Sequence, residues 1–424
     1  MKIQKAFFAF SCVAAALAFS NDSRAVDWPG WRGADRTGVN PEKGLMKSWP
    51  AEGPKQLWVY RNAGKGYSGS AVVKGVLYTL GTREDYELLI ALDVATGKEL
   101  WTSNVGSILG NKWGDGPRGT PAVDGDRVYA MGGKGDLVCV TARDGKVVWK
   151  KSMKELGGNE PNWGYSESVL VDGPRVLCTP GGAQGSIVAL DKASGALLWQ
   201  TKDFTDNAHY SSIIAVDHNG ARQYVQLTPK SVVGVSAKDG KVLWKSDWHG
   251  TVAVIPTPIF AYGHVYVSSG YKAGCKLIKV GANNEVSTVY GDNKVMENHH
   301  GGVVYLNGSL YGFSDVKGGS WICQDFKTGE QLWSSKNLGK GAVACVDGML
   351  YCLEEGSGTV ALVEASPKGW NEKGRFKLDP QSAIRSPSGR IWTHPVVSDG
   401  KLFLRDQDLV YCYQVRANPA RKSN

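Results

Sequence analysis

The chain has 424 residues, of which 42% are hydrophobic and 21% charged, so its composition is that of a folded protein rather than a disordered one. A single compact core stops growing near about 250–300 residues, so this length indicates either two domains or a repeat architecture. The formal net charge is +9, but Lys and Arg are scattered along the chain, which argues against nucleic-acid binding.

The first 25 residues have the pattern of a targeting segment. Two lysines precede an apolar run over residues 6–20, which is too short to span a bilayer comfortably, and Ser-Arg-Ala at 23–25 fits a cleavage site. We therefore predict a signal peptide over 1–25 and export to the periplasm or the extracellular space. An uncleaved anchor and a lipid anchor at Cys12 are the alternatives. No later stretch is long and apolar enough to cross a membrane.

An internal repeat dominates the rest of the chain. Each copy is a short apolar strand, a turn that ends in Gly, and a second strand that ends in Trp. The Asp of the turn can accept backbone N–H bonds and the Gly supplies positive φ, so each copy predicts a β-hairpin. The clear copies are Ala91–Trp101, Val140–Trp149, Ala189–Trp199, Val235–Trp244 and Cys323–Trp333.

Weaker copies of the same hairpin complete the series. Two of them end at Tyr290 and Phe376, and a first partial copy ending at Trp58 has only the second strand. The terminal aromatic residues are 43 to 50 residues apart. The 15 tryptophans and 54 glycines of the chain agree with large side chains and tight turns at repeated places.

A second two-strand unit lies before each hairpin and also recurs eight times. Four strands in about 45 residues make one blade of a β-propeller. We therefore predict an all-β, eight-bladed propeller of four-stranded antiparallel blades over 55–416, with seven or nine blades as alternatives. The last unit ends at 409–413 without a Trp strand, so the strand around Trp58 is expected to complete it and close the ring.

Two flanking segments and the cysteines lie outside this pattern. Residues 26–54 are expected to be a lead-in that wraps one face, and 417–424 a polar tail. Seven cysteines follow the predicted leader, and no Cys-x-x-Cys is present, which excludes zinc-ribbon and haem-attachment motifs. Most lie in apolar strand-like runs, so we expect buried packing thiols.

The pattern Ala-x-Asp-x-x-x-Gly-x-x-x-Trp resembles the repeat of the pyrroloquinoline quinone (PQQ)-type propellers over almost the whole predicted mature chain. The phrase at 27–33, Asp-Trp-Pro-Gly-Trp-Arg-Gly, is similar to the start of secreted members from planctomycete-type bacteria. The resemblance implies relatives of two kinds: quinoprotein alcohol dehydrogenases, which bind PQQ and calcium, and the outer-membrane assembly lipoprotein propeller, which binds proteins. The adjacent cysteine pair and the haem motif of such dehydrogenases are absent from this sequence.

Residues just before the innermost strand of each blade lie at one mouth of the propeller channel, and here they are polar and aromatic. We predict a funnel for a polar or anionic ligand, in which basic side chains supply charge and aromatic ones supply stacking faces. The alternative is that these residues only hold channel water and satisfy strand ends. The candidates are Lys65, Tyr67, Asp115, Arg118, Trp163, Tyr165, Glu167, His209, Tyr210, Asn298, His299, His300, Lys340, Trp392 and His394.

Metal binding is a narrower hypothesis at this mouth. Calcium prefers several oxygen ligands, and Glu167, Asn298 and Asp115 are its best candidates. His299 and His300 would point to opposite faces in a strand, so they would not chelate together. His300 could instead meet a histidine from another blade, either His209 or His394.

Three functions follow from these observations. The favoured one is an exported, non-catalytic module that binds a protein or a polymer at the channel mouth. The second is a PQQ- and calcium-dependent alcohol or sugar dehydrogenase, with Asp115 as base and Arg118 as the cation over the quinone. The third is a glycan-binding propeller that uses the aromatic mouth. The sequence does not define the oligomeric state.

Overall fold

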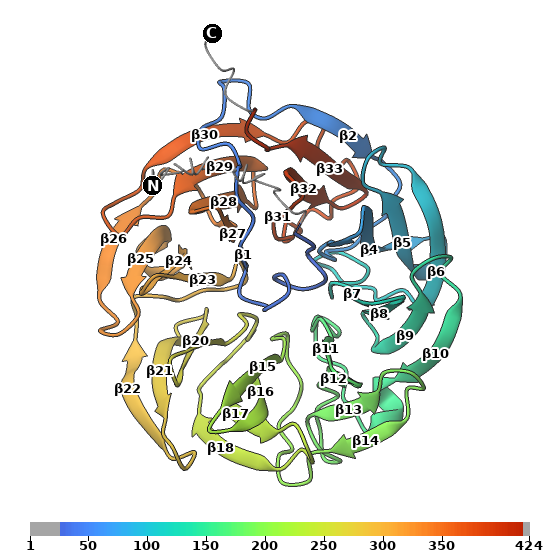
Figure 1. Cartoon of the computed structure of the whole chain (residues 1–424), viewed down its shortest axis with the longest axis vertical. Coiled ribbons are helices and arrows are strands. Elements are labelled where there is room, and N and C mark those ends of the chain that lie inside the picture. Colours follow the sequence, from blue (N-terminus) through green and yellow to red (C-terminus); the bar gives the residue numbers. More distant parts are fainter. Residues whose placement is uncertain (1–25, 419–424) are drawn as a thin grey trace, which may run out of the picture.

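The computed structural model describes residues 26–418 as eight antiparallel sheets arranged radially around a central axis (Figure 1). The predicted number of blades, including those with the weak copies at Tyr290 and Phe376, is confirmed. The helical content of the described residues is two short 3-10 turns, η1 (Met153–Leu156) and η2 (Val316–Gly318). Neither is long or apolar enough to cross a membrane.

The first four blades each take four consecutive strands. Blade 1 contains β3 (Ala71–Val73), β4 (Val76–Arg83), β5 (Tyr86–Asp93) and β6 (Glu99–Ser107). Blade 2 contains β7 (Ala122–Asp124), β8 (Arg127–Met131), β9 (Asp136–Thr141) and β10 (Val147–Ser152). Blade 3 contains β11 (Leu170–Asp172), β12 (Arg175–Cys178), β13 (Val188–Asp191) and β14 (Leu197–Gln200). Blade 4 contains β15 (Ile214–His218), β16 (Ala221–Leu227), β17 (Ser231–Ser236) and β18 (Val242–Asp247).

The last four blades follow the same plan until the ring closes. Blade 5 contains β19 (Ile259–Ala261), β20 (His264–Ser269), β21 (Gly274–Val280) and β22 (Val286–Asn293). Blade 6 contains β23 (Val303–Leu306), β24 (Ser309–Ser314), β25 (Ser320–Asp325) and β26 (Gln331–Ser335). Blade 7 contains β27 (Gly341–Val346), β28 (Met349–Glu354), β29 (Thr359–Glu364) and β30 (Glu372–Lys377), with β1 (Val39–Asn40) added beside β27. Blade 8 contains β31 (Val396–Ser398), β32 (Lys401–Asp406), β33 (Leu409–Gln414) and β2 (Gln56–Tyr60).

Blade 8 joins the two ends of the propeller. Its outer strand β2 pairs antiparallel with β33, and Trp58 lies opposite Cys412. The predicted closure, in which the strand around Trp58 completes the last blade, is confirmed. Because the sheet is shared by both ends of the chain, the ring has no open seam.

The repeated tryptophans join neighbouring blades. Trp149 of blade 2 donates its indole N–H to the carbonyl of Lys192 in blade 3, at 3.0 Å. Its ring covers Gly195, where an added Cβ would lie 2.7 Å from the indole. Gly195 also has φ of +72°, so both space and backbone conformation require glycine there. The same bond to the next blade is made by Trp58, Trp101, Trp199 and Trp333.

Trp244 departs from this arrangement. Its indole donates to Gln223 of its own blade, at 2.8 Å, and its ring is more buried than those of most other copies. Tyr290 keeps the bond between blades, since its hydroxyl donates to the carbonyl of Phe326 at 3.1 Å. The predicted packing of the terminal aromatics between blades therefore holds for most copies.

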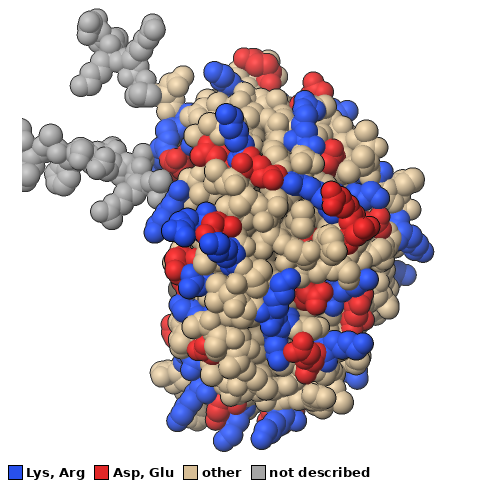
Figure 2. Space-filling model, turned by 90° about the vertical axis from the view of Figure 1, so that its right-hand side faces the viewer, with Lys and Arg blue, Asp and Glu red and all other residues tan. Residues whose placement is uncertain are grey.

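The core consists of apolar strand residues packed between facing blades. One cluster joins Leu89 of β5 to Val138 of β9, and others repeat this contact around the ring. The seven cysteines of residues 26–418 are buried and free, which confirms the predicted packing role. On the outer face seen in Figure 2, Lys and Arg side chains are interspersed with Asp and Glu.

Residues 27–40 pass through the ring, and we call this segment the plug (Figure 1). At the start of the plug, Trp28 pairs with Val72 of β3 in blade 1. At its end, β1 pairs in parallel with β27 of blade 7. Thus the lead-in does more than cover a face of the propeller. Residues further along it, such as Trp49, pack on blade 7 at Phe376.

Two arginines fix the plug to several blades. Arg36 donates to the carbonyl of Ile213, at 2.8 Å, and to that of Ser168. Arg32 donates to the carbonyl of Val303, at 2.5 Å. Buried carbonyls at the ends of inner strands are satisfied in this way.

We expect Trp149→Ala to destabilise the protein strongly. The side chain is 8% exposed and makes both the indole bond and the contact with Gly195, so its loss should cost about 3–5 kcal/mol. Chemical denaturation followed by tryptophan fluorescence measures this change. The control is Leu197→Ala on β14, which is 50% exposed and should change stability by less than about 0.5 kcal/mol. Equal effects of the two variants would contradict the proposed contact between blades.

Candidate functional site

A cavity of about 290 Å³ opens at one mouth of the channel. Its walls are mainly aromatic. Among the described residues that line it, Arg118 is the one Asp, Glu, Lys or Arg residue. A concave, largely apolar pocket with a few polar groups is the usual form of a small-ligand site. The lining residues are Trp31, Tyr67, Gly69, Trp113, Arg118, Trp163, Ser166, Tyr210, Ala253, Ile255, Tyr271, His299, His300, Trp392, Thr393 and His394.

The structure brings eight of the fifteen predicted site residues to this cavity. They come from loops that precede the innermost strands of blades 1, 2, 3, 4, 6 and 8. Propeller geometry therefore places residues that are far apart in sequence around one opening. The eight are Tyr67, Arg118, Trp163, Tyr210, His299, His300, Trp392 and His394.

Three of the other predicted residues do not line the cavity and are engaged with close partners. Lys65 forms an ion pair with Asp115 at 3.0 Å. Burial raises the pKa of Asp115, but the Asn111 N–H and Lys65 outweigh it, so the pKa is lowered overall. Tyr165 is buried and donates its hydroxyl to the carbonyl of Pro180 at 3.1 Å.

Glu167 is buried between its own blade, blade 4 and the plug. Its carboxylate accepts the Thr179 N–H at 2.7 Å and the Thr179 hydroxyl at 3.1 Å, and Gln226 lies within 3.4 Å. Burial raises the pKa of Glu167 to about 7, even though Thr179 and the charge of Arg36 act in the opposite direction. This residue serves the scaffold and does not line the cavity.

Asn298 and His209 have structural partners as well. The Asn298 amide donates to the carbonyls of Gly302 and Phe313, at 3.2 and 3.0 Å, and its oxygen accepts the Gly302 N–H. His209 Nδ1 accepts the Val254 N–H at 3.1 Å, and burial lowers the pKa of this histidine to about 4. Both side chains therefore hold loops in place.

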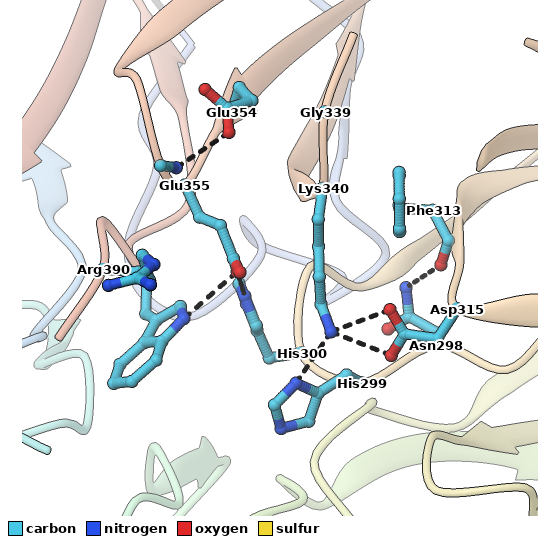
Figure 3. A network of polar contacts seen from close by, with 12 residues as sticks. Asn298, His299, His300, Phe313, Asp315, Gly339, Lys340, Glu354, Glu355 and Arg390 are labelled. Atoms are coloured by element: carbon cyan, nitrogen blue, oxygen red, sulfur yellow. Dashed lines mark hydrogen bonds and ion pairs between the residues drawn. The ribbon is translucent and has the colours of Figure 1, made fainter. Parts of the chain in front are cut away.

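Lys340 fixes the orientation of His299 at the cavity wall (Figure 3). Its ammonium group lies 2.8 Å from Asp315 and 3.0 Å from His299 Nδ1, which must accept because an ammonium group can only donate. Burial, together with His300 and Lys340, lowers the pKa of His299 to about 2, so its ring is neutral. The ring proton is then on Nε2, which faces the Tyr271 hydroxyl at 3.1 Å.

Glu355 anchors the second wall of the same network (Figure 3). One carboxylate oxygen accepts from His300 Nε2 at 2.5 Å and from the Trp392 indole at 3.1 Å. Burial raises the pKa of Glu355, but the hydrogen bond and charge of His300 outweigh it, and the net shift is downward. A single ionised carboxylate thus orients two lining rings. His300 Nδ1 has no partner among the described residues.

The expected separation of His299 and His300 does not occur. They lie in a loop before β23 rather than in a strand, and both rings line the cavity with centroids 5.4 Å apart. The His394 ring contacts the main chain of His300, since His394 Nε2 donates to the His300 carbonyl at 3.1 Å. His209 has no such contact with them among the described residues, because its ring is held by Val254.

The plug supplies the floor of the cavity. Trp31 packs edge-on against His394, with centroids 4.6 Å apart, and its indole donates to Thr257 at 2.8 Å. Behind it lies a void of about 10 Å³, which has room for about one water molecule. The cavity is therefore a blind pocket on the plug rather than an open channel.

Several lining or supporting residues were not predicted. Tyr271, Asp315 and Glu355 lie in the loops between the second and third strands of blades 5, 6 and 7. Loops between the second and third strands reach the same mouth as loops before the innermost strands. A search of the sequence that covered both kinds of loop would have found these residues. Trp31 lies in the Trp-Pro-Gly-Trp-Arg-Gly phrase, but only the path of the plug places it in the pocket.

The candidate calcium ligands do not converge at this mouth, and no cysteine among the described residues lines it. Calcium needs several oxygen ligands around one point, whereas Glu167, Asn298 and Asp115 each face their own separate partners. Within residues 26–418 no three His, Cys, Asp or Glu side chains converge to hold a metal ion. The described cysteines are buried, and none of them lines the cavity, so no thiol faces a bound quinone.

Eight radial blades with the repeated Asp, Gly and Trp hairpin and a pocket at the channel mouth define a PQQ-like β-propeller. A family model described as outer membrane protein assembly factor BamB matches residues 84–335. The chain belongs to this family, which confirms the resemblance inferred from the repeats.

Curated relatives match parts of the chain. Tetrathionate hydrolase of Acidithiobacillus ferrooxidans is 22% identical over 232 residues, which are 51% of this chain and 44% of the relative. Quinoprotein ethanol dehydrogenase of Pseudomonas aeruginosa is 30% identical over 32% of this chain and 23% of its own length. BamB of Escherichia coli is 33% identical over 24% of this chain and 25% of its own length. The matches thus span less than half of each relative.

Solved structures support the fold over nearly the whole chain. BamB of Moraxella catarrhalis superposes with a TM-score of 0.62 at 16% identity, covering 87% of this chain and 99% of that one. Quinohemoprotein alcohol dehydrogenase of Comamonas testosteroni gives a TM-score of 0.65 at 12% identity, covering 94% and 82%. At these identities the likeness establishes the propeller architecture alone.

We expect Glu167→Gln to change how stability depends on pH. In the folded state the pKa of Glu167 is about 7, above its ordinary 4.5, so the folded protein retains this proton after the unfolded chain has lost it. Its contribution to stability is complete below pH 4.5 and is lost as the pH rises through 7. The variant should therefore gain up to about 3 kcal/mol relative to the wild type over this range.

Urea unfolding at several pH values between 4 and 8 measures this difference. Glu330→Gln, at an exposed turn position, is the matched control and should follow the wild type. A constant difference between Glu167→Gln and the wild type at all pH values would contradict the raised pKa.

Proposed function

We propose that this protein is a non-catalytic binding module outside the cytoplasm, which holds one ring of an extended glycan in the aromatic cavity. The observation that supports this most is the lining itself, in which four tryptophans and three tyrosines surround about 290 Å³. A sugar ring has apolar C–H faces that pack on such side chains, while its hydroxyl groups need a few fixed hydrogen-bonding partners. The volume is at the small end of ligand sites, which suits one ring better than a folded protein surface.

The polar groups of the cavity have set directions. With its Nε2 proton directed at Tyr271, neutral His299 leaves the Tyr271 hydroxyl hydrogen available to a ligand. Trp163 packs beside Tyr210, with centroids 5.7 Å apart, and Trp392 beside Tyr67, at 5.1 Å. The rings of each pair are tilted by 60° and 48° and hold one another in place, so little side-chain freedom is lost on binding.

The same lining argues against hydrolysis of the ligand. Glycoside hydrolysis uses two carboxyl groups on either side of the scissile bond. Among the described residues that line the cavity there is no Asp or Glu, and Glu355 behind it is already bound to His300 and Trp392. The site is therefore suited to holding a ring rather than cleaving a bond beside it.

Export forms part of this proposal. The predicted signal peptide, 1–25, lies outside the described residues, as do residues 419–424 of the predicted tail. Support comes from the sequence pattern and from the kinship with BamB, an outer membrane protein assembly factor. After the predicted signal peptide, residues 26–54 form the plug and its continuation, and residues 55–416 form the propeller.

A protein-binding role is the second candidate, and the family match over 84–335 favours it. A partner of this kind would contact the loops around the mouth rather than fill the cavity. Cross-linking of the purified protein to cell-envelope fractions tests it. A partner that is captured equally by the wild type and by a cavity variant would use the loops, whereas no reproducible partner would remove this candidate.

We expect Trp392→Ala to weaken glycan binding by about ten-fold or more, because a buried aromatic anchor of a ligand site contributes at least about 1.4 kcal/mol. Isothermal titration with oligosaccharides that are positive on a glycan array measures the change. Tyr262→Ala, which removes a ring that is 83% exposed and does not line the cavity, should bind as the wild type does. An array without any signal for the wild type would overturn the proposed function.

A further inference from the structure

Arg118 is a cation at the cavity wall without an ion-pair partner among the described residues. Its guanidinium group lies over the Tyr67 ring, 5.3 Å from the centroid. It donates to the carbonyls of Gly116 and Gly114, at 2.6 and 3.0 Å. These two bonds engage two of its five N–H groups, so donors remain for a ligand.

A second buried arginine shows what a purely structural role looks like in this fold. Arg405 of β32 is 1% exposed and, unlike Arg118, lines no part of the cavity. Its three nitrogens donate to five acceptors, which are Gln407 O, Ser68 O, Thr79 Oγ1, Leu80 O and Gly64 O. Arg118 has fewer bonds and faces open space, and its Nε has no partner in the described part of the chain.

The acidic groups nearest to Arg118 are already engaged. Asp115 is paired with Lys65 at 3.0 Å. Glu87 accepts the N–H groups of Leu109 and Gly133, at 3.0 and 2.7 Å. Both carboxylates act on Arg118 only through space, and the histidine rings beside the cavity add no negative charge. A part-buried charge without a close counterion favours an anionic ligand.

We propose that the bound ring carries a carboxylate that Arg118 receives, which makes the ligand a uronate unit of an acidic polysaccharide. This inference rests on the proposed glycan-binding function. A planar guanidinium group with free N–H donors matches a carboxylate in shape as well as in charge. The aromatic walls take the faces of the sugar ring, and Arg118 selects the ring that bears an acid group.

The decisive comparison uses trigalacturonate and its fully methyl-esterified form as probes. The two have the same rings, and the ester differs in that a methyl group removes the charge of each carboxylate; the Arg118→Met variant reports whether the added methyl group alone affects binding. For the wild type we expect the acid to bind at least about ten-fold more tightly than the ester, because hydrogen bonds between charged partners are the stronger ones. Arg118→Met should bind both forms about equally, and Arg118→Lys should retain part of the preference.

Arg222→Met is the matched control, because Arg222 lies on the outer surface in ion pairs with Asp172 and Asp217. Equal binding of acid and ester by the wild type would overturn the uronate assignment and leave glycan binding intact. Binding of neutral oligosaccharides alone would do the same. Binding of no saccharide of either kind would overturn the glycan-binding function itself. If Arg118→Met does not fold, Arg118→Lys keeps the test decisive, because an unchanged preference for the acid in that variant would contradict selection by the guanidinium group.

Discussion

The contact between the outer-strand tryptophan of one blade and the glycine turn of the next holds this propeller together. It combines a hydrogen bond, as from Trp149 to the Lys192 carbonyl, with a ring that covers a position open only to glycine. Each copy fixes the angle between two neighbouring sheets. Because copies recur around the ring, the loops at the channel mouth are presented by a rigid frame. The cavity is thus a product of packing that lies far from it, at the outer rim.

The plug converts this frame into a pocket. A closed ring of eight blades leaves an axial channel, and residues 27–40 cross it while pairing with inner strands of two blades. Arg32 and Arg36 satisfy strand-end carbonyls that would otherwise face the axis. Trp31 then forms the floor of the cavity. Without this segment the aromatic residues would line a water-filled passage, which would offer a ligand no enclosed surface.

The fold could be predicted from the sequence because each repeat marks its own turns and strand ends. Asp, Gly and Trp at fixed offsets define the hairpins, and the orphan strand at Trp58 indicated how the ring closes. The site was predicted only in part. The position of a residue before an inner strand correctly placed Tyr67, Arg118 and Trp392 at the mouth. It could not distinguish a lining side chain from one such as Glu167, which is buried between two blades.

The missed residues have a common physical reason. Tyr271 and Glu355 belong to loops between the second and third strands, whose convergence on the same mouth is a property of the assembled ring. Trp31 depends on the path of a segment without a repeat pattern. The tautomers of the histidines depend on Lys340 and Glu355, which only the three-dimensional arrangement brings within hydrogen-bonding distance.

The shared eighth blade has a consequence for the order in which the molecule can be assembled. Its outer strand precedes the first blade in the chain and its other three strands follow the seventh, so the circle cannot be completed until the strands of all eight blades have been synthesised. A nascent chain that lacks β33 therefore exists as an open arc, with the edge of β2 unpaired.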